Sequence, residues 1–177
     1  MEVKYWHHPA ETINLLVENN EVTSTIQIFT DGSQSEQGVG AGVAMFRSGN
    51  HIKSLKYRLN NRCTNNQAEQ LAIVRALEFT ENLQTEDKTA IIYTESRMKL
   101  DSLKNNNIHT FLIKEIRTLT EMGKTHWKIQ FCWVKAHVEI QGNELADTLA
   151  KEAETNVDIK ECYKKFPKSV VISELRD

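Results

Sequence analysis

The spacing of apolar positions predicts five β-strands between residues 25 and 133. Residues 25–31 form an apolar run, and residues 39–47 form a second run that is rich in Gly and Ala. In a third segment, residues 55–59, apolar and basic side chains alternate with the period of a half-exposed strand. The breaks between these segments are short and rich in turn residues, so we expect three antiparallel strands.

Two later strands are expected at residues 88–94, a nearly continuous apolar run, and at residues 127–133, where Trp, Ile and Phe alternate with polar side chains. Helical periodicity separates them from the earlier strands, which favours parallel pairing through right-handed crossovers. The predicted fold class is therefore α/β, with a mixed five-stranded sheet (three antiparallel strands and then parallel strands) flanked by helices. The expected helices cover residues 64–82, 95–104, 109–122 and 142–154.

Length and composition favour one compact domain of ordinary make-up. The chain has 177 residues, and we expect an N-terminal extension at 1–24, a domain at 25–155 and a polar, weakly patterned tail at 156–177. Three dispersed cysteines without a CxxC pair, no long apolar run and no secretory signal predict an intracellular protein of the cytoplasm or nucleus, with no membrane partner. The net charge of −2 and pI of about 6.3 argue against strong autonomous nucleic-acid binding.

Four acidic residues lie at the ends of successive predicted elements. Asp31 follows the first strand, Glu69 lies near a helix start, Glu95 follows the fourth strand, and Asp147 lies in the last helix. Carboxylates repel one another, so they gather only where a cation holds them, and divalent metals with oxygen ligands are the usual cations. The pattern indicates metal-assisted chemistry on a phosphate ester.

Each acid also has a simple structural explanation. Asp31 and Gly32 form a common turn pair. Glu69 can pair with Arg62 or lie at the solvated edge of its helix. Glu95 and Asp147 can each favour a helix N-terminus, with Asn143 as a cap before Asp147. Taken together, however, the four positions match the carboxyl ends of strands where ligand crevices form. His137 precedes the last acid by ten residues; a loop histidine is usually only exposed, but beside acids it can shuttle protons.

Four segments carry a family resemblance that covers roughly residues 25–155. The chain resembles the type I ribonuclease H family, and the stretch from Val134 to Asp147 looks most like the ribonuclease H domains of non-LTR (LINE-type) retrotransposon polyproteins. The matching segments are Thr30–Ser33, Thr64–Glu69, Trp133–His137 and Gly142–Asp147.

The resemblance implies a monomeric, metal-dependent endonuclease that hydrolyses the RNA strand of RNA/DNA hybrids, expected to act during retrotransposon reverse transcription beside an upstream reverse transcriptase region. It implies two Mg²⁺ ions, with Mn²⁺ as an alternative. Asp31 would bridge both ions, Asp147 would hold the ion that activates water, and Glu69 and Glu95 would hold the ion at the leaving oxygen. His137 would assist proton transfer or product release.

The resemblance also implies which residues contact the hybrid. Asn65 and Asn66, at the start of the first helix, would hydrogen-bond base edges and 2′-hydroxyls. Gly32 and Ser33, which follow the first acid, would approach RNA through their backbone. Arg62 and Thr64 would hold a phosphate of the DNA strand.

The chain departs from the family pattern at three points. Glu95 replaces the usual Asp, Glu139 replaces a loop glycine, and no basic insertion lies between Glu95 and His137. A second hypothesis is therefore a catalytically weakened or inactive hybrid-binding (tethering) module of a retroelement polyprotein. A DEDD exonuclease or an integrase-like nuclease shares the carboxylate chemistry, but residues 136–147 disfavour both.

Overall fold

A six-stranded mixed sheet forms the centre of the computed structural model, which describes residues 25–95, 111–123, 126–134 and 141–165. The strand order is β5-β4-β1-β2-β3-β6. The strands are β1 (Ile26–Ser35), β2 (Gly38–Arg47), β3 (Asn50–Leu59), β4 (Thr89–Thr94), β5 (Lys128–Trp133) and β6 (Glu161–Tyr163). The described helices are α2 (Asn65–Glu81), α4 (Phe111–Gly123) and α5 (Gln141–Thr155).

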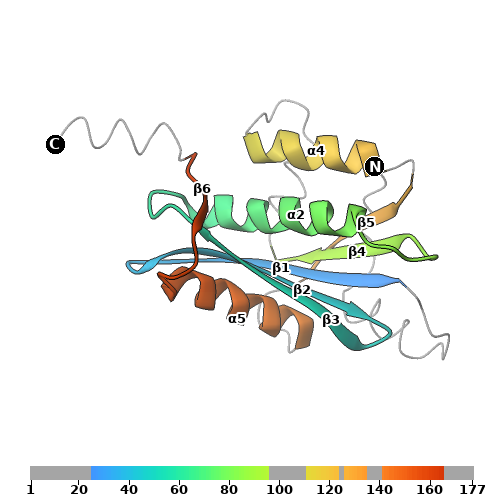
Figure 1. The fold of residues 1–177 in the computed structure, drawn as a ribbon, viewed down its shortest axis with the longest axis horizontal. Helices are drawn as coiled ribbons and strands as arrows, with labels where there is room; N and C mark the ends of the chain where they lie inside the picture. The colour runs from blue at the N-terminus through green and yellow to red at the C-terminus, as the bar shows by residue number, and fades with distance from the viewer. Residues whose placement is uncertain (1–24, 96–110, 124–125, 135–140, 166–177) are drawn as a thin grey trace.

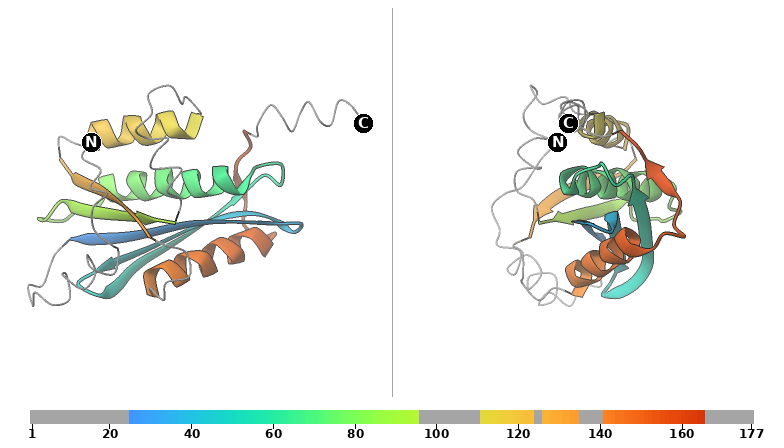
Figure 2. Two further views of the ribbon diagram at one scale, coloured as in Figure 1. Left: turned by 180° about the vertical axis from the view of Figure 1, so that it is seen from behind. Right: turned by 90° about the vertical axis from the view of Figure 1, so that its left-hand side faces the viewer.

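The pairing of the strands confirms the predicted fold class. β1, β2 and β3 are antiparallel, whereas β4 pairs parallel with β1 and β5 pairs parallel with β4. Helices α2 and α4 lie on one face of the sheet and α5 lies on the other (Figures 1 and 2). Within the described residues, no helix has the length and apolar character needed to cross a membrane.

Alternate side chains of β1 pack into two separate hydrophobic cores. Ile28 points into the larger core beneath α2 and α4, and the next residue, Phe29, points into the smaller core beneath α5. This is the period-two geometry of a strand that is covered on both faces. The Phe29 ring stacks on Tyr93 of β4 with the ring centroids 4.7 Å apart, which ties the two parallel strands together on the α5 side.

Helix α5 lies very close to β2 because two glycines leave room for its backbone. A Cβ atom on Gly40 would lie 2.1 Å from the carbonyl oxygen of Ala150, and one on Gly42 would lie 2.3 Å from that of Ala146. Real Cβ atoms do not approach backbone oxygens so closely, so any larger residue would push the helix away. The Gly- and Ala-rich composition of this strand is therefore a packing requirement.

Strand β1 is longer than the sequence predicted. We expected it to end at Asp31, followed by a turn at Gly32 and Ser33, but the strand continues to Ser35. These residues keep pairing with β2 in unbroken antiparallel register, from Asp31 opposite Gly42 to Ser35 opposite Gly38. The Asp-Gly pair is therefore strand, since the long-range ladder outweighs its local turn preference.

The C-terminal side of the domain contains a strand that the sequence did not predict. Residues 156–177 were expected to be a tail, yet β6 pairs parallel with the edge strand β3. β6 has only three residues, too few for a periodic pattern to reveal the strand. β3 begins at Asn50, five residues before the segment predicted for it, and the other expected elements within the described residues are present with small shifts of their ends. The expected helix at 95–104 lies, apart from Glu95, outside the described residues.

Candidate active site

Strand register places Asp31 beside Glu95. Thr30 of β1 lies opposite Thr94 of β4 in the parallel ladder, and each acid is the next residue on its strand. The Thr30 hydroxyl also donates a hydrogen bond to the Tyr93 carbonyl at 3.1 Å. Because β4 ends at Thr94 while β1 continues, the two carboxylates meet where the parallel ladder stops, which is the usual position of a ligand crevice.

The other neighbour of β1 brings Asp147 to the same place. Asp31 lies opposite Gly42 in the antiparallel ladder, and the missing side chain of Gly42 is where the Ala146 carbonyl of α5 approaches. Asp147 is the next residue along that helix. The close packing of α5 on β2 therefore decides how near the two aspartates lie.

Glu69 reaches the site because Gly32 has no side chain. A Cβ atom on Gly32 would lie 2.7 Å from the backbone nitrogen of Glu69 and 2.8 Å from its Cγ atom. The first turns of α2 thus pack directly on β1, one residue after Asp31. All four acids predicted from the sequence come from separate elements and surround one stretch of β1.

The site carries an excess of negative charge around Asp31. The pKa of its carboxyl group is raised to about 7, chiefly by burial and further by the neighbouring carboxylates of Glu95 and Asp147. The Gly32 N–H group, which donates to Asp31 Oδ1 at 2.8 Å, and the Lys151 ammonium group act in the opposite direction. The cluster is therefore poorly neutralised by the protein itself, as expected of a site that receives a cation.

Three of the acids accept a hydrogen bond from a nearby side chain. In the described part of the chain, no three acidic, His or Cys side chains converge on one point as metal ligands would. Local donors hold the carboxylates instead. Asn65 Nδ2 donates to Glu69 Oε1 at 2.9 Å, Lys151 Nζ donates to Asp147 Oδ2 at 2.7 Å, and Asn143 Nδ2 donates to Glu95 Oε1.

The donor set nevertheless fits a divalent cation such as Mg²⁺. Carboxylate and amide oxygens are the hard ligands that this ion prefers. Among the described residues, the buried amide oxygens of Asn65 and Asn143 accept no hydrogen bond, although each lies on a side chain that holds an acid of the site. Unsatisfied buried oxygens beside clustered carboxylates indicate a place for a cation with its bound water.

Four of the six residues expected to contact a hybrid, namely Arg62, Thr64, Asn65 and Asn66, lie in the loop before α2 and at its start. Thr64 and Gln67 form the predicted capping box, with Gln67 N donating to Thr64 Oγ1 at 3.2 Å. Asn65 is half-buried, and its backbone N–H group donates to Gln34 Oε1 at 2.9 Å. Arg62 and Asn66 are exposed, so their side chains are accessible to a ligand.

The structure gives Gly32 and Ser33 roles inside the protein. Gly32 makes room for α2, as described above, and the Ser33 hydroxyl donates to the carboxylate of Glu154, which lies on α5. Their expected backbone contacts with RNA stay a prediction. His137 and Glu139 lie outside the described residues, so the expected proton-transfer role of His137 also stays a prediction.

Two residues of the site were not assigned by sequence reasoning. Asn143 was considered only as a helix cap, but α5 begins at Gln141, and Asn143 is 5% exposed inside the first turn, where it holds Glu95. Lys151 was not considered at all. Its position four residues after Asp147 was the available indication, since such pairs meet on a helix surface.

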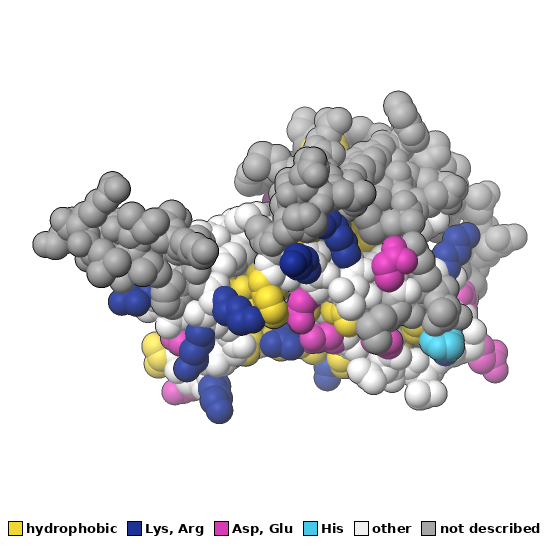
Figure 3. Space-filling model, turned by 90° about the horizontal axis from the view of Figure 1, so that it is seen from above, with side chains coloured by type: hydrophobic (Ala, Val, Ile, Leu, Met, Phe, Trp, Pro, Cys, Tyr) yellow, Lys and Arg dark blue, Asp and Glu magenta, His cyan; other side chains and the backbone are white. Residues whose placement is uncertain are grey.

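Basic side chains do not dominate the surface in view. On the face that Figure 3 shows, the described Lys and Arg side chains are scattered among acidic ones. This agrees with the slightly negative net charge of the chain. Any contact with a polyanion on this face would therefore rely on a few local cations.

A mixed sheet with carboxylates from four elements around one strand is an arrangement suited to a hydrolase that uses divalent metals. The RNase H family model matches residues 23–155. A ribonuclease H of Maricaulis maris is 34% identical over 143 residues, which cover 73% of this chain and 93% of the relative. The chain therefore belongs to the RNase H family.

Solved structures share this fold. The RNase H1 of Halobacterium salinarum superposes with a TM-score of 0.56 at 21% identity, covering 73% of this chain and 96% of the other. LC11-RNase H1, solved in complex with an RNA/DNA hybrid, superposes with a TM-score of 0.55 at 20% identity, covering 72% and 98%. At these identities the likeness establishes the fold, namely the ribonuclease H-like α/β arrangement.

Proposed function

We propose that this protein is a metal-dependent endonuclease that hydrolyses the RNA strand of RNA/DNA hybrids. The observation that carries the proposal is the gathering of Glu69, Glu95 and Asp147 around Asp31, in a chain that belongs to the RNase H family. The hybrid as substrate is supported by the family and by the complex of LC11-RNase H1 with a hybrid.

The four acids are the residues that would hold two Mg²⁺ ions, with Mn²⁺ as an alternative. When bound, such ions lower the pKa of water and neutralise charge on a scissile phosphate. The protein's own part is to orient the carboxylates. Asn65 and Asn143 fix the directions of Glu69 and Glu95 through their amide groups. Asp31 lies on the central strand β1, whose neighbours are β4 and β2.

Residues beside the acids would bind the substrate. Arg62 and Asn66 are exposed in the turn that leads into α2 and in its first turn, a few residues before Glu69. A guanidinium group binds phosphate through paired hydrogen bonds, and an amide group can bind base edges or a 2′-hydroxyl in a wide minor groove. Because Asn66 lies within one helical turn of Glu69 and Arg62 lies in the loop just before the helix, a strand bound there would pass the acids.

A narrower proposal concerns the origin of the domain. The residues from Val134 to Asp147 favour a retrotransposon polyprotein with an upstream reverse transcriptase region. The relatives reported above are cellular enzymes and give this origin no support, so it rests on that stretch alone. The hydrolytic function does not depend on it.

The test is cleavage of end-labelled RNA/DNA hybrid, double-stranded DNA and single-stranded RNA by the purified protein in Mg²⁺ and, separately, in Mn²⁺. We expect internal cuts in the RNA of the hybrid alone, leaving 5′-phosphate and 3′-hydroxyl ends. Equal cleavage of the other two substrates would refute hybrid specificity. Hybrid binding without cleavage in either metal would favour the inactive tethering module instead.

A further inference from the structure

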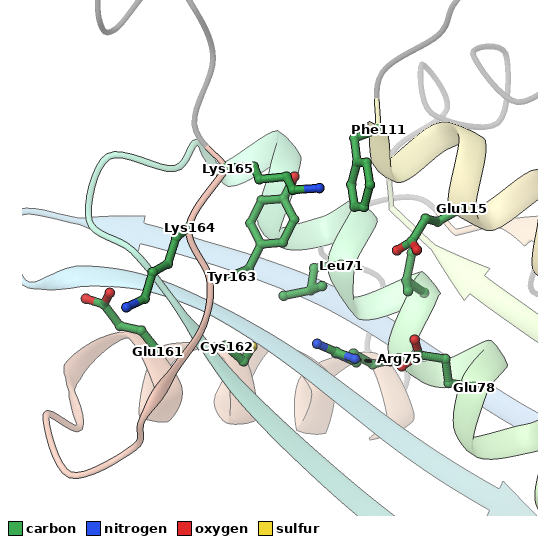
Figure 4. Close-up of a pocket in the computed structure, with 11 residues that line it drawn as sticks. Leu71, Arg75, Glu78, Phe111, Glu115, Glu161, Cys162, Tyr163, Lys164 and Lys165 are labelled. Atoms are coloured by element: carbon green, nitrogen blue, oxygen red, sulfur yellow. Dashed lines mark hydrogen bonds and ion pairs between the residues drawn. The ribbon is translucent and has the colours of Figure 1, made fainter.

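Strand β6 lies next to the loop that carries the expected hybrid contacts. The RNase H family model ends at residue 155, so β6 lies beyond the matched region. In Figure 4, the chain from Glu161 to Lys165 runs past the start of α2 toward the beginning of α4. The loop at residues 60–64 joins β3, the strand with which β6 pairs, to α2.

Asn60 connects β6 to this loop through four hydrogen bonds, two to β6 and two within the loop. Its backbone N–H group donates to the Tyr163 carbonyl at 2.9 Å, and its side-chain Nδ2 donates to Glu161 Oε2 at 3.1 Å. Its Oδ1 accepts from the backbone N–H group of Arg62 at 3.1 Å, and its carbonyl accepts from that of Cys63 at 2.9 Å. Asn60 therefore fixes the backbone of the loop at Arg62 and Cys63, and β6 in turn fixes Asn60.

A second connection reaches the capping box of α2. Gln67 uses Oε1 to accept from the Thr64 N–H group at 3.0 Å and uses Nε2 to donate to the Lys165 carbonyl at 2.6 Å. The same side chain thus caps the helix and binds the chain after β6. Because Asn65 and Asn66 occupy the first turn of that helix, their positions depend on this side chain.

The far side of the loop is held by β1. Gln34 donates from Nε2 to the Cys63 carbonyl at 3.2 Å and accepts from the Asn65 N–H group at 2.9 Å. The loop is therefore fastened between a central strand and the C-terminal segment. Only the second attachment lies outside the family-matched residues.

The C-terminal segment is itself well anchored. Tyr163 is 9% exposed and belongs to the larger core. The Lys165 ammonium group lies 3.3 Å from the centroid of the Phe111 ring at the start of α4, a cation–π contact. Between these contacts, a cavity of about 490 Å³ is lined by α2, α4 and the C-terminal segment, so the segment bridges the two helices at its rim.

We propose that residues 161–165 position the loop at residues 60–66 for hybrid binding. The inference rests on the proposed function for its substrate. Glu161 is a positioning residue in this scheme, since it acts through Asn60 on the backbone of Arg62. Glu69 is held separately, because Ala68, Leu71 and Ala72 beside it are buried in the core. Loss of the C-terminal attachment should therefore weaken hybrid binding more than it slows the chemical step.

The test compares two matched pairs of variants of the full chain. Glu161→Ala removes the acceptor for Asn60, whereas Glu161→Gln keeps an oxygen there. A chain that stops after Lys160 lacks β6, whereas one that stops after Lys165 retains it. For each we would measure KM and kcat on hybrid, the melting temperature, and amide hydrogen exchange of residues 60–67.

We expect KM for the hybrid to rise about tenfold in Glu161→Ala and in the chain ending at Lys160, because one hydrogen bond to a charged group is lost. In both variants kcat should stay within about twofold of the wild-type value. Amides of residues 60–67 should exchange faster in both. Glu161→Gln and the chain ending at Lys165 should match the wild type. If the shorter chain does not fold, the two Glu161 variants decide the question.

An unchanged KM in folded Glu161→Ala, or an equal loss in Glu161→Gln, would overturn the proposal, as would a loss confined to kcat. If the wild type cuts no hybrid, the proposed function fails by itself. Hydrogen exchange then decides the positioning role, and unchanged protection of residues 60–67 in Glu161→Ala would overturn it.

Discussion

Gly42 lies directly opposite Asp31 in the β1–β2 ladder, and the Ala146 carbonyl of α5 occupies the space that a side chain on Gly42 would need. One residue without a side chain thus sets the separation between two acids that are 116 positions apart in the sequence. The catalytic geometry proposed above depends on this contact.

Gly42→Ala should therefore damage both stability and activity. The added Cβ atom would lie 2.3 Å from a backbone oxygen, so α5 must move and carry Asp147 away from Asp31. We expect a loss of about 1–3 kcal/mol in the free energy of unfolding and a larger relative loss of hybrid cleavage. Urea unfolding and initial rates would measure the two effects. Gly49→Asn, in open space at a turn, is the control and should match the wild type.

Asp31→Asn should remove nearly all cleavage and leave the fold intact. A neutral amide cannot hold two divalent cations together, whereas the hydrogen-bonding shape of the side chain is almost unchanged. Cleavage of labelled hybrid and circular dichroism would measure the two properties. Activity near the wild-type level in a folded variant would show that the site has been assigned to the wrong residues.

The pKa of Asp31 also predicts how the stability of the metal-free protein depends on pH. Its value is about 7 in the folded protein against 3.8 for an unperturbed group, so the folded state binds the proton more tightly. The free energy of unfolding should fall as pH rises from about 4 to about 7, by up to about 4 kcal/mol, from about 1.4 kcal/mol per pKa unit. Urea unfolding in EDTA would measure this slope.

The slope should disappear in Asp31→Asn, which has no proton to lose, and that variant should be the more stable protein at pH 8. Asp158→Asn changes an exposed acid outside the cluster and should keep the wild-type slope. An Asp31→Asn variant that is no more stable than wild type at pH 8 would show that the cluster does not strain the metal-free fold.

Lys151→Met should tighten Mg²⁺ binding. Lys151 donates to Asp147 at 2.7 Å and is 64% exposed, so it is a weakly held positive charge that competes with an incoming cation. We expect the Kd for Mg²⁺, measured by calorimetry without substrate, to fall about two- to threefold, as befits an exposed ion pair. Lys56→Met breaks a similar surface pair with Glu152 and should leave the Kd unchanged.

Glu95→Asp tests the departure from the family pattern. Glu is one methylene longer than Asp, whereas Mg²⁺ demands a nearly ideal octahedral arrangement of ligands. We expect the wild type to work relatively better with Mn²⁺ and the variant to gain Mg²⁺-dependent cleavage, both measured as initial rates. If the variant is unchanged or slower in Mg²⁺, the contact from Asn143 has already adapted the site to Glu95.

Hybrid binding by the isolated chain should be weak and strongly dependent on salt. The chain has a net charge of −2, and basic side chains are scattered on the face in Figure 3. Phosphate contacts release counterions, so affinity should fall steeply as salt rises. Fluorescence anisotropy of labelled hybrid with Asp31→Asn would measure this. Nanomolar binding at physiological salt would contradict the prediction.

Local patterns in the sequence determined most of the fold. The capping box at Thr64 and Gln67, the buried stripe of α2 and the apolar runs of β1, β2 and β4 were all predictable, because periodicity and capping act between residues near one another in the chain. The same patterns singled out the four acids, because the sequence placed each of them near an end of a predicted element, and their metal-binding role stays a prediction.

The tertiary structure decided what depends on contacts between distant residues. Asp31 lies within β1 because its ladder with Gly42 outweighs an Asp-Gly turn, and Asn143 holds Glu95 because α5 begins earlier than its cap-like sequence suggests. β6 exists because an edge strand offers it partners, although three residues carry no period of their own. Pairing and packing across the sheet, which no local pattern records, set these features.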